Sequence, residues 1–94
     1  MALKSPIIVR RVSGHSMSPN LEPGWIIIAR RSKRIAFGDV VIANMENMEI
    51  VKRVVELKKK QVHLAGDHHG HDGQHDAGWV DQSDVVARVI WPKV

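Results

Sequence analysis

Ser16 lies in a short turn sequence, SGHSMSPNL at residues 13–21, directly after an apolar run. A serine in a turn usually satisfies only backbone groups, whereas a nucleophilic serine also needs a base and hydrogen-bond donors for an oxyanion. The chain contains no cysteine, so a thiol nucleophile and a disulfide framework are both excluded. Ser16 is therefore the candidate nucleophile, provided that another segment supplies the base.

The candidate base is Lys52, which lies in an apolar stretch at residues 48–57. Side chains alternate along a strand, so either Lys52 or Arg53 must stand between β-branched residues on the face toward the core. Burial lowers the pKa of a lysine, and a neutral amine can take the proton of a serine hydroxyl. Arginine keeps its proton at accessible pH, which favours Lys52. The alternative interpretation is that Lys52 extends its amine into solvent.

Short runs rich in Val and Ile, separated by turn residues, predict the elements that position these two side chains. No segment keeps a helical apolar period for three turns, although a short helical turn fits residues 16–21. Residues 66–78 carry few apolar side chains and are expected to form a surface loop. Glu46-Asn47 and Lys58-Lys59-Lys60 are expected to close hairpins. The strands are expected at about 6–12, 25–31, 39–45, 48–57, 61–65 and 84–91.

The length of 94 residues, with 44% apolar residues, predicts one globular domain spanning residues 1–94. The expected fold class is all-β, a single compact domain of mixed, strongly coiled β-sheets. No apolar run approaches the roughly 18–20 residues that span a bilayer, and no signal peptide is visible. We therefore expect a cytoplasmic protein if the chain is complete, and a membrane-associated one if an N-terminal anchor was removed.

Four sequence blocks occur in order: GHSMSPNL at 14–21, GDVV at 38–41, KRVV at 52–55 and GD at 66–67. They resemble the blocks of the type I signal peptidase family, which run G-x-S-M-x-P-T-L, G-D-V-V, K-R-V-V-G and G-D-N. The resemblance extends over about residues 8–94. It implies the catalytic core that signal peptidases share with LexA-type domains.

The resemblance implies a Ser-Lys dyad, with Ser16 as the nucleophile and Lys52 as the general base. The backbone N–H of Ser16 would form part of an oxyanion hole, in a turn supported by Gly14, Met17 and Pro19. The implied reaction is cleavage of a precursor protein or peptide bound as an extended strand, without a cofactor. Small residues are expected immediately before the scissile bond.

The chain is smaller than typical signal peptidases, which carry membrane segments before the serine and a large inserted β-domain after the lysine. Here, only 13 residues separate Lys52 from Gly66. In size and architecture the chain is most similar to the nickel-type superoxide dismutase maturation proteases, which remove a short leader. A nickel superoxide dismutase precursor is therefore the expected substrate. The alternative is a general signal peptidase domain that lacks its membrane anchor.

The sequence departs from the family pattern at two places. Asn20 replaces the threonine of the first block. After G-D-N the family usually has S-x-D-S-R, whose first serine helps to orient the lysine, whereas residues 74–79 read QHDAGW. Aligning Asp76 with the family aspartate puts Gln74 in the place of that serine, so both are lysine-orienting candidates. An inactive domain that binds peptides is the alternative implied by these changes.

Five histidines and three aspartates fall within residues 63–76. Imidazole and carboxylate suit zinc, nickel or copper, but the spacing does not match a closed structural site. The preferred interpretation is a solvated loop with no resident metal. The candidate ligands, should a metal bind, are His68, His69, His71 and His75.

Two further hypotheses compete with the leader peptidase, and membrane contact is a separate open question. A LexA-type self-cleaving domain would need a DNA-binding segment and a cleavable peptide before Ser16, and residues 1–15 show neither. A nucleic-acid module would use the net charge of +4, but one Phe and no Tyr give little for base stacking, so no nucleic-acid partner is expected. Membrane contact through apolar residues at 7–8 and 25–28 stays open as an alternative.

Overall fold

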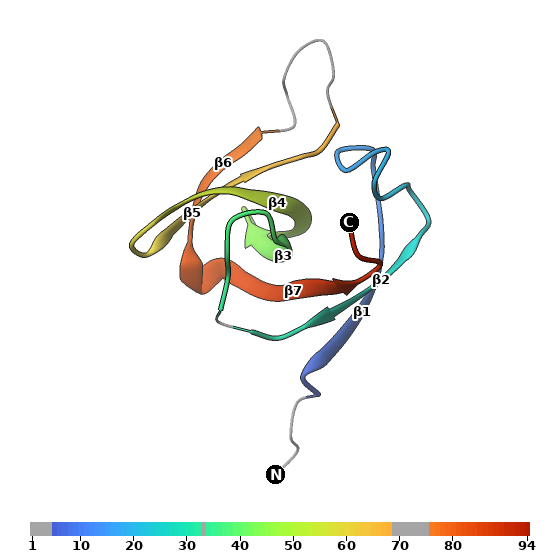
Figure 1. Ribbon diagram of the computed structural model, residues 1–94, viewed down its shortest axis with the longest axis horizontal. Helices are drawn as coiled ribbons and strands as arrows, with labels where there is room; N and C mark the ends of the chain where they lie inside the picture. The colour runs from blue at the N-terminus through green and yellow to red at the C-terminus, as the bar shows by residue number, and fades with distance from the viewer. Residues whose placement is uncertain (1–4, 33, 69–75) are drawn as a thin grey trace.

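The computed structural model describes residues 5–32, 34–68 and 76–94, which form one antiparallel sheet of seven strands (Figure 1). Along the sheet the strands follow the order β1-β2-β7-β3-β4-β5-β6. No helix among the described residues is long and apolar enough to cross a membrane. The elements are β1 (Ile7–Arg11), β2 (Ile26–Arg30), β3 (Val40–Met45), β4 (Met48–Lys58), β5 (Gln61–Ala65), β6 (Asp76–Asp81), the 3-10 helix η1 (Gln82–Asp84) and β7 (Val85–Trp91).

The all-β prediction is confirmed, and the six expected strands are found within one residue at each end. The sheet is a single antiparallel one, so the expectation of several mixed sheets is wrong in that detail. β6 was not expected, because residues 76–78 were assigned to the loop. Residues 16–20 form hydrogen-bonded turns that do not extend into a helix, and the Leu21 N–H bond to the Met17 carbonyl has the spacing of the single helical turn fitted to residues 16–21.

The hairpin that joins β3 to β4 is closed by the two residues Glu46 and Asn47, as predicted. Both have positive φ values, 50° and 64°, which match the turn type that suits the twist of paired strands. Met45 pairs with Met48 directly across this turn. The turn therefore fixes the register of β4 against β3, and Val41 pairs with Lys52.

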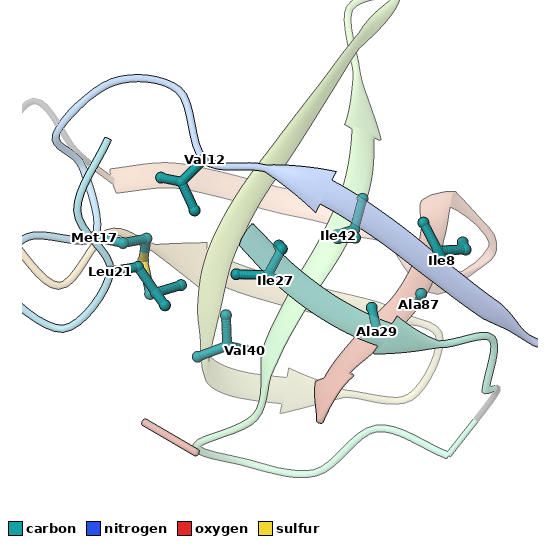
Figure 2. Packing of buried hydrophobic residues seen from close by; sticks show 9 residues of the cluster. All are labelled: Ile8, Val12, Met17, Leu21, Ile27, Ala29, Val40, Ile42 and Ala87. Atoms are coloured by element: carbon teal, nitrogen blue, oxygen red, sulfur yellow. The ribbon is translucent and has the colours of Figure 1, made fainter. Parts of the chain in front are cut away.

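β3 lies at the centre of the sheet and is buried on both faces. Val40 and Ile42 belong to a core cluster with β1, β2 and β7, whereas Val41 and Ala43 belong to a second cluster with β4, β5 and β6. Two covered faces explain why this strand reads as a continuous apolar run instead of an alternating one. The first cluster consists of Ile8, Val12, Met17, Leu21, Ile27, Ala29, Val40, Ile42 and Ala87 (Figure 2).

Candidate functional site

Ser16 lies in a tight turn between β1 and β2 that is anchored in the first core cluster. Met17 is 2% exposed and Leu21 is fully buried, so the turn is attached to the core directly after the serine. The Ser18 N–H donates to the His15 carbonyl (3.0 Å), and the Leu21 N–H donates to the Met17 carbonyl (2.9 Å). These contacts fix the turn while Ser16 itself remains partly exposed.

The turn begins at Gly14, which has a φ of +79° and no neighbouring atom within 4 Å of the place where a Cβ would stand. The positive φ, and not lack of space, is therefore what favours glycine there. Pro19 is exposed and follows a cis peptide bond. Gly14 thus begins the turn and Met17 anchors it in the core, while the support that Gly14, Met17 and Pro19 give to a nucleophile stays a prediction.

Lys52 lies in the middle of β4 and is half-buried. Burial lowers the pKa of its amine from the ordinary value of 10.5. Among the described residues, no carboxylate pairs with this amine to oppose that effect. Burial therefore shifts the Lys52 amine toward its neutral form, which is the direction that a role as a base requires.

Ser16 and Lys52 line the same pocket, which has a volume of about 280 Å³. The end of β1 and the following turn form one wall, and the first half of β4 forms the other. No hydrogen bond joins the Ser16 hydroxyl to the Lys52 amine among the described contacts. The lining consists of Arg10, Arg11, Val12, Ser13, Ser16, Met17, Met48, Glu49, Ile50, Val51 and Lys52.

Arg53, the residue after Lys52, connects segments from all four sequence blocks. Its Nε and Nη2 donate to the two carboxylate oxygens of Asp67 at 2.7 and 2.6 Å. Its Nη1 donates to the carbonyl oxygen of Gly38 at 2.7 Å. The Asn20 amide donates to Asp67 Oδ2 at 2.9 Å. The hydrogen bond to Asp67 raises the pKa of the Arg53 guanidinium.

The loop after β5 is also joined to the serine turn through the main chain. The His68 N–H donates to the Ser16 carbonyl at 2.9 Å. Together with the contact between Asn20 and Asp67, this bond holds Gly66-Asp67-His68 against the turn that carries Ser16. The position of Ser16 relative to β4 thus depends on Arg53 and Asp67 as well as on the strands.

The roles of Arg53, Asp67 and Asn20 were missed by reasoning from the sequence. Arg53 was considered only as a rejected base, and Asn20 only as a departure from the family pattern. A signal was present, since each of the four blocks contributes one member to this network. Asn20 keeps a hydrogen-bond donor in the place of the family threonine, which explains why the departure is compatible with the turn.

Several predicted site residues lie outside the described part of the chain. Gln74, His69, His71 and His75 belong to residues 69–75, and the side chain of Asp76 is likewise not described. His68 is described, and its backbone contacts the Ser16 turn. No group of three metal-ligating side chains occurs in the described segments. The lysine-orienting and metal hypotheses therefore stay predictions.

The fold is an antiparallel sheet, and a serine and a partly buried lysine line one of its pockets. These features match a serine-peptidase-type domain, and the comparison with family models supports the same class. The Peptidase S24-like family model matches residues 2–90. The chain belongs to this family and is a serine-peptidase-type domain. Neither the search of curated proteins nor the search of solved structures finds a match to the chain.

Proposed function

We propose that this protein is a serine endopeptidase that uses Ser16 and Lys52 as a catalytic dyad to remove a leader peptide from a precursor protein. The observation that carries the proposal is the shared pocket, in which a serine lies with a lysine whose pKa is lowered by burial. Membership of a peptidase family supports the reaction type. A nickel superoxide dismutase precursor is the proposed substrate, on the resemblance in size and architecture.

In the proposed mechanism, Lys52 begins as a neutral amine. Ser16 Oγ attacks the carbonyl carbon of the scissile peptide as Lys52 Nζ takes the hydroxyl proton. The backbone N–H of Ser16 stabilises the oxyanion that forms. The carbon–nitrogen bond then breaks, and the Lys52 ammonium gives its proton to the leaving amine. Water, deprotonated by the same amine, hydrolyses the acyl-enzyme and regenerates the serine.

The shape of the pocket supports a peptide with small side chains next to the scissile bond. Its volume of about 280 Å³ lies just below the range of about 300–1,000 Å³ that is typical of small-molecule sites, so there is little room for large side chains. Met17 and Val51 contribute apolar surface to the lining, which suits small aliphatic groups.

The test is incubation of the protein with a nickel superoxide dismutase precursor and with a secretory preprotein, followed by mass spectrometry of the products. Ser16→Ala and Lys52→Arg should each abolish cleavage, the latter because arginine keeps its proton. Ser83→Ala in η1 and Lys58→Arg at the far end of β4 are the matched controls and should retain activity. Cleavage by Ser16→Ala at the wild-type rate would refute the proposal.

The same assay distinguishes the proposed function from its competitors. Cleavage of the secretory preprotein alone would indicate a general signal peptidase. Cleavage of the protein's own chain, at a rate that does not depend on protein concentration, would indicate a LexA-type reaction. Binding of a peptide to the intact fold without any cleavage would indicate a peptide-binding domain, as the departures after Gly66-Asp67 imply.

A further inference from the structure

A pocket distinct from that of Ser16 lies where three distant segments meet. These segments are the loop after β2, the turn between β4 and β5, and the corner that η1 forms before β7 (Figure 1). The pocket has a volume of about 380 Å³, within the range of about 300–1,000 Å³ that is typical of small-molecule sites. It shares no lining residue with the pocket of Ser16, so the two are separate.

The walls of this corner pocket are held by contacts that need no ligand. The Gln82 N–H donates to the Lys60 carbonyl at 2.7 Å, which joins the corner to the turn between β4 and β5. Ile35 and Val85, which line the pocket, also pack against the second core cluster. A preformed pocket loses little conformational entropy when a ligand binds.

Two opposite charges line the corner pocket. Lys60 contributes an ammonium and Asp81 a carboxylate, and neither takes part in an ion pair with another described residue. Hydrogen bonds from Ser83, and to a smaller extent the charge of Lys60, lower the pKa of Asp81. Both groups are therefore charged at neutral pH. Because they do not contact each other, each can bind a charged group of a ligand.

The Asp81 carboxylate is oriented by the protein and still has acceptor capacity. The Ser83 N–H donates to Asp81 Oδ1 at 2.9 Å, which fixes the carboxylate at the corner. A carboxylate has about four lone-pair sites, so Asp81 can accept further hydrogen bonds from the ammonium group of a ligand.

Ile35 and Val85 give the same pocket an apolar surface. A ligand that uses all of these groups carries an ammonium for Asp81, a carboxylate for Lys60 and an aliphatic group for Ile35 and Val85. These are the groups of an aliphatic α-amino acid. We propose that the corner pocket binds a free α-amino acid with an aliphatic side chain, as a zwitterion held by Asp81 and Lys60.

A ligand with a single charge fits this pocket less well. A carboxylate alone would gain the attraction of Lys60 but would face the like charge of Asp81, and an amine alone would face that of Lys60. A zwitterion has neither unfavourable contact. The inference is independent of the proposed peptidase activity, because none of these residues lines the pocket of Ser16.

The first test is a titration of the full chain with L-leucine, followed by two-dimensional NMR of the backbone amides. Lys60 and Asp81 are exposed, so solvent competes with the ligand and a dissociation constant on the order of 1 mM is expected. The largest shifts should fall on Lys60 and on residues 81–85. No saturable shift at concentrations well above the millimolar range, or shifts confined to the Ser16 pocket, would overturn the proposal.

Three partial ligands test the zwitterion. 4-Methylpentanoate lacks the ammonium of leucine, 3-methylbutylamine lacks its carboxylate, and glycine lacks its side chain. Each should bind at least about tenfold more weakly than L-leucine, since each loses one of the three contacts. Binding of either singly charged ligand as tightly as L-leucine would show a simple anion or cation site, and would overturn the zwitterion.

Variants then locate the contact. Asp81→Asn and Lys60→Gln should each weaken leucine binding about tenfold or more, because each replaces a charged partner with a neutral amide. Asp84→Asn and Lys59→Gln make the same changes at neighbouring residues outside the pocket lining, and should alter binding less than about twofold. Circular dichroism shows which variants are folded, and the wild-type titration stands without them. Equal losses within either matched pair would overturn the assignment to this pocket.

Discussion

Arg53 and Arg10 each bind a carboxylate from a distant segment, but the surroundings of the two ion pairs differ. The Arg53 and Asp67 side chains are 21% and 11% exposed, and both guanidinium–carboxylate contacts are 2.7 Å or shorter. The Arg10 and Glu49 side chains are 44% and 33% exposed, with one short contact of 2.6 Å and one of 3.4 Å. Water therefore competes more strongly for the charged groups of Arg10 and Glu49 than for those of Arg53 and Asp67.

This difference separates a pair that determines the geometry of the site from one that lies along its edge. Arg53 also donates to Gly38, and Asp67 also accepts from Asn20, so the enclosed pair connects three loops. Arg10 and Glu49 join β1 to β4 at the pocket wall, where solvent screens their attraction. The same two charge types can thus have very different effects on stability.

The largest effect is expected for Arg53→Ala. It leaves the Asp67 carboxylate in a poorly exposed position without its main cation, and the free energy of unfolding should fall by about 3 kcal/mol. Urea unfolding followed by circular dichroism measures this change. Loss of less than about 1 kcal/mol would show that the enclosed pair does not organise the loops.

A smaller effect is expected for Asn20→Ala, which removes one hydrogen bond to Asp67 and leaves the ion pair intact. The free energy of unfolding should fall by about 1 kcal/mol. The double variant Asn20→Ala/Arg53→Ala should lose less unfolding free energy than the sum of the two single losses, because both side chains bind the same carboxylate. Strict additivity in this double-mutant cycle would argue against a connected network.

Lys52 extends the comparison to a cation with no carboxylate partner among the described residues. Burial lowers its pKa below 10.5, so the ammonium form is less stable in the folded state than in the unfolded one. Lys52→Met should therefore be more stable than the wild type at neutral pH. This advantage should decrease as the pH rises from the lowered pKa toward 10.5, because the unfolded wild type then holds more protons.

Urea unfolding across this pH range measures the Lys52 effect. Lys60→Met, at an exposed lysine in the turn between β4 and β5, is the control for the loss of one lysine. An advantage of Lys52→Met that grows with pH would contradict a lowered pKa.

The smallest effect is expected for Arg10→Ala, since both members of this pair are accessible to solvent. Its urea midpoint should stay close to that of the wild type, and the remaining difference should shrink in 0.5 M salt. A loss of unfolding free energy comparable to that of Arg53→Ala would show that the two ion pairs contribute equally to stability, contrary to this prediction.

The sequence predicted the strands well because most of them have a local signal, a β-branched run between turn residues. β6 was missed because its sequence, DAGWVD, has a single β-branched residue and an interior glycine, so it lacks the β-branched run that marks most of the other strands. It forms by pairing with β5, where Val62 opposes Val80 and His63 opposes Trp79. Such pairing depends on residues far apart in the chain, and no local pattern contains it.

The candidate site was also predicted only in part. The order of the four blocks was enough to select Ser16 and Lys52, since residue type and spacing can be read directly. The contacts of Arg53 with Asp67 and Gly38 could not be derived from strand periodicity, because they depend on where three loops meet. Periodicity placed Arg53 on a strand face without indicating that its guanidinium would connect those loops.

The burial of β3 on both faces has a consequence for how the site is assembled. Val40 and Ile42 belong to one core cluster and Val41 and Ala43 to the other, so a slip of β3 by one residue would exchange one apolar pair for another. Hydrophobicity alone therefore specifies this register weakly. The two-residue turn at Glu46 and Asn47 sets the register instead, and any change in its length would move Lys52 along β3, away from its place opposite Val41.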